Sequence, residues 1–105
     1  MNGLQTLETF QVHIKLPEIF TRRFAALIPM QRDRVNQLME ERVILNYALD
    51  MDRNNIWITM QAKNQETIMD ILSTFPIIKD VTLDIYELAF FDSRSEEHTS
   101  ELQSP

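Results

Sequence analysis

The chain has 105 residues, with ten basic and sixteen acidic side chains, a net charge of −6, one glycine and no cysteine. The lack of cysteine excludes disulfides, thiolate nucleophiles and zinc–thiolate sites. The single glycine, Gly3, excludes glycine-rich phosphate loops, dinucleotide fingerprints and glycine-flanked nucleophile elbows. An acidic composition disfavours nucleic-acid binding, and the one basic cluster, within residues 22–34, is interrupted by Asp33 as on a solvated helix face.

Residues 1–8 read as an N-terminal extension before one domain at residues 9–93. The extension has neither the positive start nor the apolar core of a signal peptide. No apolar run approaches the roughly eighteen residues needed to cross a bilayer. We therefore expect a cytoplasmic protein with no membrane partner.

A strand is expected at residues 9–16, because apolar and polar side chains alternate there. A helix follows, with Thr21 as its cap. Pro29 lies inside this helix, so we expect either a kink near residues 25–28 or a short helix followed by a longer one. The buried stripe of the helical segment is expected to consist of Phe24, Leu27, Ile28, Gln31, Val35, Leu38 and Met39.

Two further strands, at residues 43–51 and 56–62, are expected to form a hairpin. Its turn covers residues 52–55, where asparagine would tolerate a left-handed backbone. Asn64 then caps a second helix, which ends at Pro76. A last strand is expected at residues 81–91. The apolar face of the second helix comprises Ile68, Ile71, Leu72 and Phe75.

This βαββαβ order predicts an α+β, ferredoxin-like fold, with four antiparallel strands in the spatial order 4-1-3-2 and two helices on one face. The face under the helices is expected to hold Phe10, Val12, Ile14, Leu45, Tyr47, Leu49, Ile56, Ile58, Met60, Leu83 and Ile85. The open face is expected to hold Gln11, His13, Lys15, Asn46, Ala48, Asp50, Trp57, Thr59, Gln61, Asp84 and Tyr86. The open face mixes aromatic and polar groups, which suits a cavity for a small organic ligand.

His13 is the main candidate for chemistry on the open face. It is expected to lie between Asp84 or Tyr86 on one side and Trp57 or Thr59 on the other. A histidine held by a carboxylate can shuttle protons near neutral pH. The alternative is a histidine that only forms hydrogen bonds within a dimer interface, where the two aromatic side chains would also pack.

Asp84 has an alternative role as well, as a partner of Lys15 or a solvated strand residue. A metal centre is not expected, because the domain has one histidine and no cysteine.

Two segments, VHIKLP at residues 12–17 and LSTFPIIKDVTLDIYE at residues 72–87, resemble muconolactone isomerases of the dimeric α/β-barrel superfamily. The resemblance covers about residues 9–91 in element order. It implies a homodimer or larger ring whose sheets pack face to face, and isomerisation of a small carboxylated lactone or related organic acid by proton transfer without a cofactor.

In this interpretation His13 is the proton shuttle, Asp84 orients it and Lys15 attracts the carboxylate. The other expected substrate-binding residues are Asn46, Trp57, Thr59 and Tyr86. The family's second strand contains tryptophan, arginine and histidine before a glycine-bearing hairpin, whereas this chain reads VILNYALD at residues 43–50. Two alternatives therefore stay open: a barrel that binds a ligand or partner without catalysis, and a barrel monooxygenase acting on haem or a quinol.

Residues 94–105, RSEEHTSELQSP, resemble a translated sequencing adapter and are expected to be a disordered, artefactual tail. A natural acidic tail is the alternative. Without this tail nine basic and thirteen acidic side chains remain, a net charge of −4. The tail's His98 therefore carries no weight in the functional argument, and the native C-terminus beyond about residue 93 is not defined.

Overall fold

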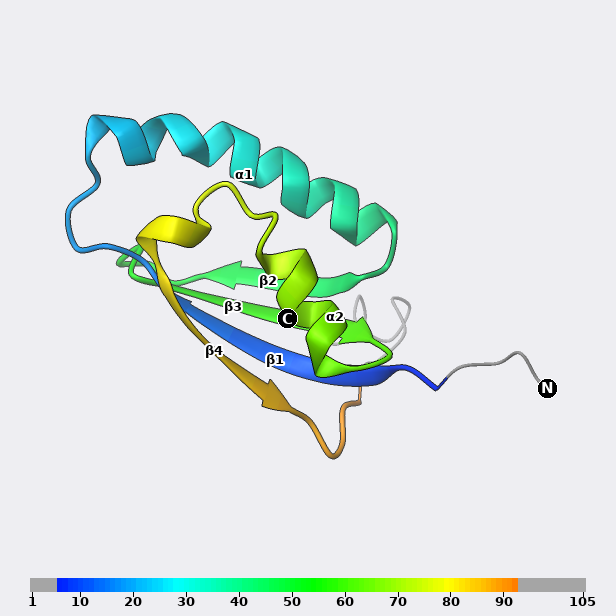
Figure 1. Cartoon of the computed structure of the whole chain (residues 1–105). Coiled ribbons are helices and arrows are strands. Elements are labelled where there is room, and N and C mark those ends of the chain that lie inside the picture. The colour runs from blue at the N-terminus through cyan, green and yellow to red at the C-terminus, as the bar shows by residue number, and fades with distance from the viewer. Residues whose placement is uncertain (1–5, 93–105) are drawn as a thin grey trace, which may run out of the picture.

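The structure is a computed structural model that describes residues 6–92. Its elements are β1 (Glu8–Lys15), α1 (Arg22–Glu40), β2 (Ile44–Leu49), β3 (Asn55–Ala62), α2 (Gln65–Leu72), a short 3₁₀ helix η1 (Ile78–Asp80) and β4 (Thr82–Glu87). The strands form one antiparallel sheet in the order β2-β3-β1-β4, and both helices lie on one face of it (Figure 1). This is the ferredoxin-like α+β fold predicted from the sequence.

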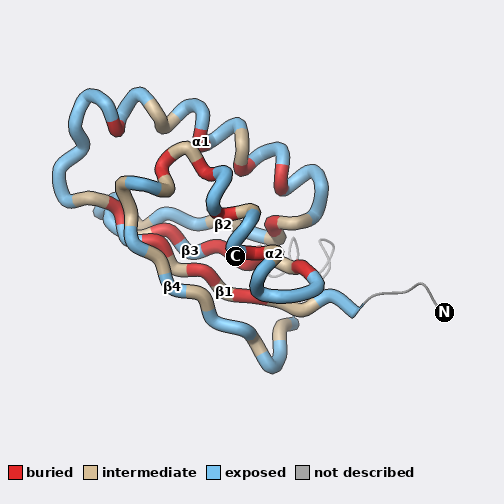
Figure 2. The backbone as a smooth tube through the Cα atoms, in the orientation of Figure 1, coloured by how far each residue is buried: buried red, intermediate tan, exposed pale blue. Residues whose placement is uncertain are grey.

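A single hydrophobic core lies between the sheet and the helices. Figure 2 shows the buried residues along β1 and β3 and on the side of the helices that faces the sheet, whereas the outer side of α1 is exposed. The largest fully buried side chains are Phe10, Val12, Ile14, Phe24, Ile44, Ile58, Met60, Ile68, Leu72, Phe75 and Ile77. Burial of this apolar surface supplies the main driving force for folding.

Strand β1 lies in the middle of the sheet and pairs with two strands at once. His13 is opposite Trp57 of β3 on one side and opposite Asp84 of β4 on the other. Because alternate residues of a strand point to opposite faces, this register places all three positions on the face away from the helices.

Helix α1 begins where the sequence predicted, with the Thr21 hydroxyl accepting a hydrogen bond of 3.0 Å from the Phe24 N–H. It runs without a break through Pro29, so of the two alternatives predicted, the short helix followed by a longer one is wrong. The missing proline N–H removes one helical hydrogen bond, and the buried residues on both sides of it, Phe24 and Val35, hold the two parts of the helix against the sheet. Met39 was expected in the buried stripe but lies near the helix end and is 37% exposed.

In strand β2, one residue expected on the core side of the sheet is replaced there by its neighbour. The pairing with β3 shifts between Ile44 and Asn46, which makes Leu45 an extra residue in a β-bulge. Ile44, opposite Met60, therefore enters the core in place of Leu45. The alternation is restored from Asn46 onward, so the rest of the predicted open face keeps its place.

The hairpin turn also differs from expectation. The residue with a left-handed backbone is Arg53, with φ of 61°, and not an asparagine. The Asp50 carboxylate explains this turn, because its Oδ1 accepts hydrogen bonds from the N–H groups of Asn54 at 2.8 Å and Asn55 at 3.1 Å. Asn55 is thereby held as the first residue of β3, and the left-handed residue is Arg53, directly before the two asparagines.

Helix α2 is capped as predicted, since the Asn64 side chain accepts a hydrogen bond of 2.8 Å from the Thr67 N–H. Neither helix in the described part of the chain is long and apolar enough to cross a membrane. The expected tail at residues 94–105 lies outside the described residues.

Candidate functional site

The open face of the sheet brings most of the predicted site residues together. Strand pairing places Gln11 beside Thr59 and Tyr86, and His13 beside Trp57 and Asp84. Asn46 extends the same face across β2, where it pairs with Thr59, and Lys15 extends it along β1. The sequence therefore predicted the composition of this face, although the hydrogen bonds within it could not be read from strand alternation.

His13 is held by a chain of side-chain hydrogen bonds that starts in the hairpin. Its ring Nε2 lies 2.8 Å from Asn55 Oδ1, and Asn55 Nδ2 donates to Asp50 Oδ2 at 2.9 Å. Together these contacts form an Asp50–Asn55–His13 chain. The sequence alone predicts Asp50 on the open face and Asn55 in the turn, without a functional role for either.

The Asp50–Asn55–His13 chain determines which histidine nitrogen carries the proton. An ionised carboxylate only accepts hydrogen bonds, so the amide nitrogen of Asn55 must face Asp50 and the amide oxygen must face His13. The amide oxygen accepts, so His13 Nε2 must be the N–H donor. In the neutral imidazole, Nδ1 is then the basic nitrogen.

The Asp50 carboxylate is itself held in its charged form. The Asn55 side-chain amide is the main cause that lowers the pKa of Asp50 below its ordinary value, and the N–H groups of residues 53–55 act in the same direction. Burial opposes this shift. The Asp50 carboxylate, at the start of the Asp50–Asn55–His13 chain, therefore stays a hydrogen-bond acceptor throughout the neutral pH range.

Aromatic and hydroxyl groups surround His13. The imidazole stacks on the Trp57 indole, with ring centroids 5.5 Å apart and planes 24° from parallel. The Thr59 hydroxyl donates to Gln11 Oε1 at 3.1 Å, and Thr59 is buried although it faces away from the helices. Trp57 and Tyr86 are 39% and 56% exposed, so each presents an aromatic surface to solvent.

The role predicted for Asp84, to orient His13, is not matched by a hydrogen bond between these two residues within residues 6–92. Asp84 lies directly opposite His13 in the register, yet the hydrogen bond of the imidazole goes to Asn55 in the part of the chain that the structure describes. The features that point to Asn55 as a partner of His13 are its position opposite Lys15 at the start of β3 and the presence of Asp50 five residues before it.

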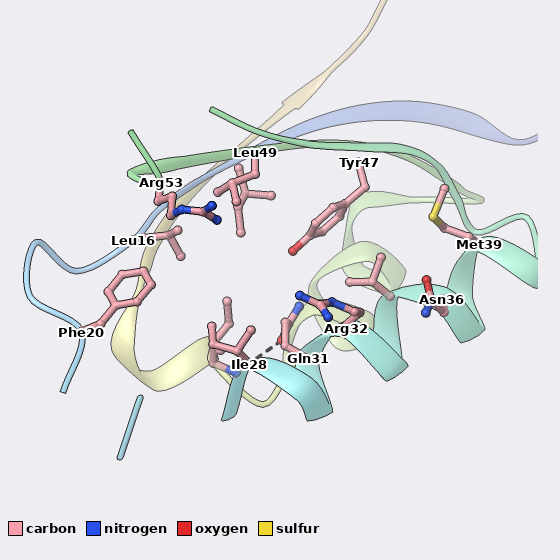
Figure 3. A pocket seen from close by; sticks show the side chains of 13 residues that line it. Leu16, Phe20, Ile28, Gln31, Arg32, Asn36, Met39, Tyr47, Leu49 and Arg53 are labelled. Carbon is pink, nitrogen blue, oxygen red and sulfur yellow. Dashed lines mark hydrogen bonds between the residues drawn. The ribbon is translucent and has the colours of Figure 1, made fainter. Parts of the chain in front are cut away.

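A cavity lies on the other side of the sheet, between α1 and the hairpin end of β2 and β3. Its volume is about 340 Å³. Figure 3 shows the Tyr47 hydroxyl and the Arg53 guanidinium pointing into this space, with Gln31 and Arg32 of α1 opposite the sheet. Much of the wall is apolar and includes Leu16, Ile28, Val35, Leu49, Ile56 and Ile77.

Gln31 and Tyr47 are the partly or fully buried polar groups of this cavity. Gln31 was predicted in the buried stripe of α1, and it is 4% exposed. Burial raises the pKa of the Tyr47 phenol, while the nearby Gln31 amide and the Arg32 charge partly oppose that rise. The Gln31 amide lies close enough to the Tyr47 hydroxyl to act as a hydrogen-bond partner that lowers the phenol pKa, yet Gln31 Nε2 makes no hydrogen bond of full geometry to any described residue.

Within residues 6–92 no group of three or more His, Asp or Glu side chains is gathered as a metal site would require. Comparison with known proteins adds no assignment, since neither a protein-family model nor a curated protein matches this sequence.

Proposed function

We propose that this chain is a muconolactone isomerase-like protein that transfers a proton within a small carboxylated lactone or a related organic acid, without a cofactor. The observation that supports this proposal best is the Asp50–Asn55–His13 chain, because it leaves His13 Nδ1 as an oriented base on the open face. The neighbouring aromatic and amide groups suit the ring and the oxygens of such a substrate.

The chemistry requires one proton to leave and one to return. His13 Nδ1 takes a proton from the ring carbon at the far end of the double bond that is conjugated with the lactone carbonyl, and the electrons of the broken C–H bond move into an extended enolate. The protonated imidazole then gives the proton to the carbon next to the carbonyl group, which restores neutral His13. A double bond has moved, nothing has been oxidised or reduced, and no co-reactant is needed.

The remaining residues have binding roles in this proposal. Lys15 supplies a positive charge near the end of β1 for the substrate carboxylate, while Trp57 and Tyr86 form the walls. Asn46 and Thr59 orient the oxygens of the ring, and Asp84 stabilises the imidazolium across the β1–β4 pair, where the register places it opposite His13.

A second copy of the chain is the proposed partner. The open face exposes large aromatic surface, and closing two such faces into a barrel would remove that surface from water. Light scattering of the full chain should then give the mass of a dimer or of a larger ring. A monomer at micromolar concentration would remove the barrel from the proposal.

The decisive experiment is a spectrophotometric assay of the purified chain with muconolactone. We expect turnover, and a fall in kcat of about 10²- to 10⁴-fold in His13→Ala, the range typical of losing a general base. His98→Ala is the matched control, because it removes the chain's other histidine. Unchanged turnover in His13→Ala would exclude the mechanism.

Binding without turnover is the second candidate, and one observation favours it. The imidazole is tied to the neutral amide of Asn55, which stabilises an imidazolium less than a carboxylate does. In that case muconolactone or another small acid should raise the melting temperature of the chain while no product forms.

A further inference from the structure

We propose a second ligand site in the cavity between α1 and the β2–β3 hairpin, which binds a small apolar monocarboxylate through the Gln31 amide and the Tyr47 hydroxyl, flanked by Arg32 and Arg53. This site is separate from the proposed proton-transfer site, because the sheet lies between the two.

Gln31 gives the first argument. Its Oε1 accepts a hydrogen bond of 3.4 Å from the Ile77 N–H, which turns the Nε2 group of the same amide the other way. Nε2 is buried and has no hydrogen-bond partner among the described residues. Buried donors are almost always paired in folded proteins, because leaving one unpaired forfeits its hydration. A donor left over on a cavity wall therefore indicates a ligand atom that accepts a hydrogen bond.

Charge gives the second argument. The cavity is lined by two arginines and by no aspartate or glutamate. The whole chain carries a net charge of −6, so a wall with only positive charges is a local exception. Arg32 and Arg53 form no ion pair within residues 6–92, which leaves their charges available to an anion. The expected acceptor is thus negatively charged.

The volume and the apolar lining of the cavity indicate what the carboxylate of the ligand is attached to. The volume of about 340 Å³ is at the lower end of the range for small-molecule pockets. Aliphatic side chains from both α1 and the sheet dominate the lining, and Phe20 and Met39 extend it at the two ends. A hydrated inorganic anion would leave this apolar surface in contact with water, whereas a carboxylate on a hydrocarbon ring or chain would bury it.

Tyr47 fits the role of a second donor. Its hydroxyl points into the cavity (Figure 3). Because burial raises the pKa of the phenol, the group stays protonated at neutral pH and can donate to a carboxylate oxygen. Two donors from α1 and β2 would then meet the two oxygens of one carboxylate, which is the geometry that gives charge-assisted hydrogen bonds their strength.

The test uses the full chain with naphthalene-2-carboxylate as the probe and naphthalene-2-methanol as its neutral counterpart. Calorimetry should show the carboxylate binding at least about tenfold more tightly than the alcohol, as expected for a charged acceptor. In a ¹H–¹⁵N correlation spectrum the side-chain amide signals of Gln31 should shift on titration with the carboxylate.

Two variants make the test specific. Gln31→Leu should weaken carboxylate binding about tenfold and leave alcohol binding unchanged, because only the hydrogen bond to the charged group is lost. Arg53→Asn should also weaken carboxylate binding, and asparagine tolerates the left-handed backbone at that position. Gln37→Leu is the matched control, since Gln37 is an exposed residue of the same helix that does not line the cavity.

Three outcomes would overturn the proposal: no carboxylate binding in the millimolar range, equal binding of acid and alcohol, or binding that neither Gln31→Leu nor Arg53→Asn weakens. Arg53 lies on the exposed hairpin, so its variant remains informative if Gln31→Leu fails to fold. None of these results depends on muconolactone turnover, so this proposal and the proposed function can fail separately.

Discussion

The two faces of the sheet are built from alternate residues of the same strands, yet they differ in almost every physical property. The face under the helices holds fully buried aliphatic and aromatic side chains such as Val12 and Ile58. The opposite face holds a polar network around His13, with exposed aromatic surface beside it. The residues that form the core and the residues of the proposed site therefore alternate along the same strands.

The largest effect should come from the covered face. Ile58→Ala removes a fully buried side chain from β3 and should lower the free energy of unfolding by about 2–5 kcal/mol. Trp57→Ala changes the adjacent residue on the open face and should cost clearly less, because Trp57 is 39% exposed and loses mainly its stacking on His13. Urea denaturation of both variants measures the difference, and equal losses would contradict the division between the faces.

The second effect concerns association and not folding. Ala48 is an exposed residue of β2 opposite Trp57, so Ala48→Arg should place an unpaired charge in the proposed barrel interior. We expect the dimer to dissociate at least about 100-fold more readily, because burying an unpaired charge is costly. Light scattering over a dilution series should show this shift, while circular dichroism stays unchanged. A dimer as stable as the unmodified one would place the interface elsewhere.

A smaller effect should follow from breaking the Asp50–Asn55–His13 chain. Asn55→Leu removes both side-chain hydrogen bonds and should cost about 1–3 kcal/mol of unfolding free energy. It should also release the His13 tautomer, which ¹⁵N chemical shifts of the imidazole report directly. Asn54→Leu is the control, because Asn54 contacts Asp50 through its backbone N–H. A ring that keeps its proton on Nε2 in Asn55→Leu would show that Asn55 does not determine the tautomer.

The smallest effect is a pH dependence with opposite signs at two places in the sheet. The pKa of Asp50 is lowered in the folded chain, so its stabilising contribution is present above the ordinary value of 3.8 and is lost as the pH falls through the lowered pKa. The pKa of Glu8 is raised above 4.5, mainly by the charge of Glu87, so this pair destabilises the fold at neutral pH and the penalty disappears on acidification.

Two variants separate these contributions. Asp50→Asn should flatten the loss of stability at acid pH, and Glu87→Gln should raise stability at neutral pH while changing little in acid. Urea midpoints measured between about pH 7 and pH 3 report both slopes. A Glu87→Gln chain that is no more stable at neutral pH would show that the two carboxylates do not repel each other appreciably.

The order of elements was predictable from the sequence because it depends on periodicity and capping. The alternation around His13, the caps Thr21 and Asn64, and the apolar stripe of α1 are all local patterns. The bulge at Leu45 was not predictable, since an extra residue in one strand is defined only by the partner that it faces. For the same reason, alternation placed His13 correctly on the open face but could not identify Asn55 as its partner.

The cavity between α1 and the hairpin could likewise be predicted only in part from the sequence. A helical period predicted that Gln31 is buried, but its unpaired amide is visible only once Ile77 and Tyr47 are packed against α1. The left-handed residue of the hairpin was likewise assigned by residue preference, whereas the hydrogen bonds to Asp50 move it to Arg53. Tertiary contacts decide such details.

The central position of β1 in the sheet has a consequence for folding during synthesis on the ribosome. Synthesis makes this strand first, but Gln11 and its hydrogen-bonded neighbour Thr59 are 48 positions apart, and β4 is made later still. Pairing across such a distance must wait for long loops to close, which slows sheet formation relative to local helix growth. The nascent chain therefore emerges with its central strand unpaired, and the sheet is completed only when β4 leaves the exit tunnel.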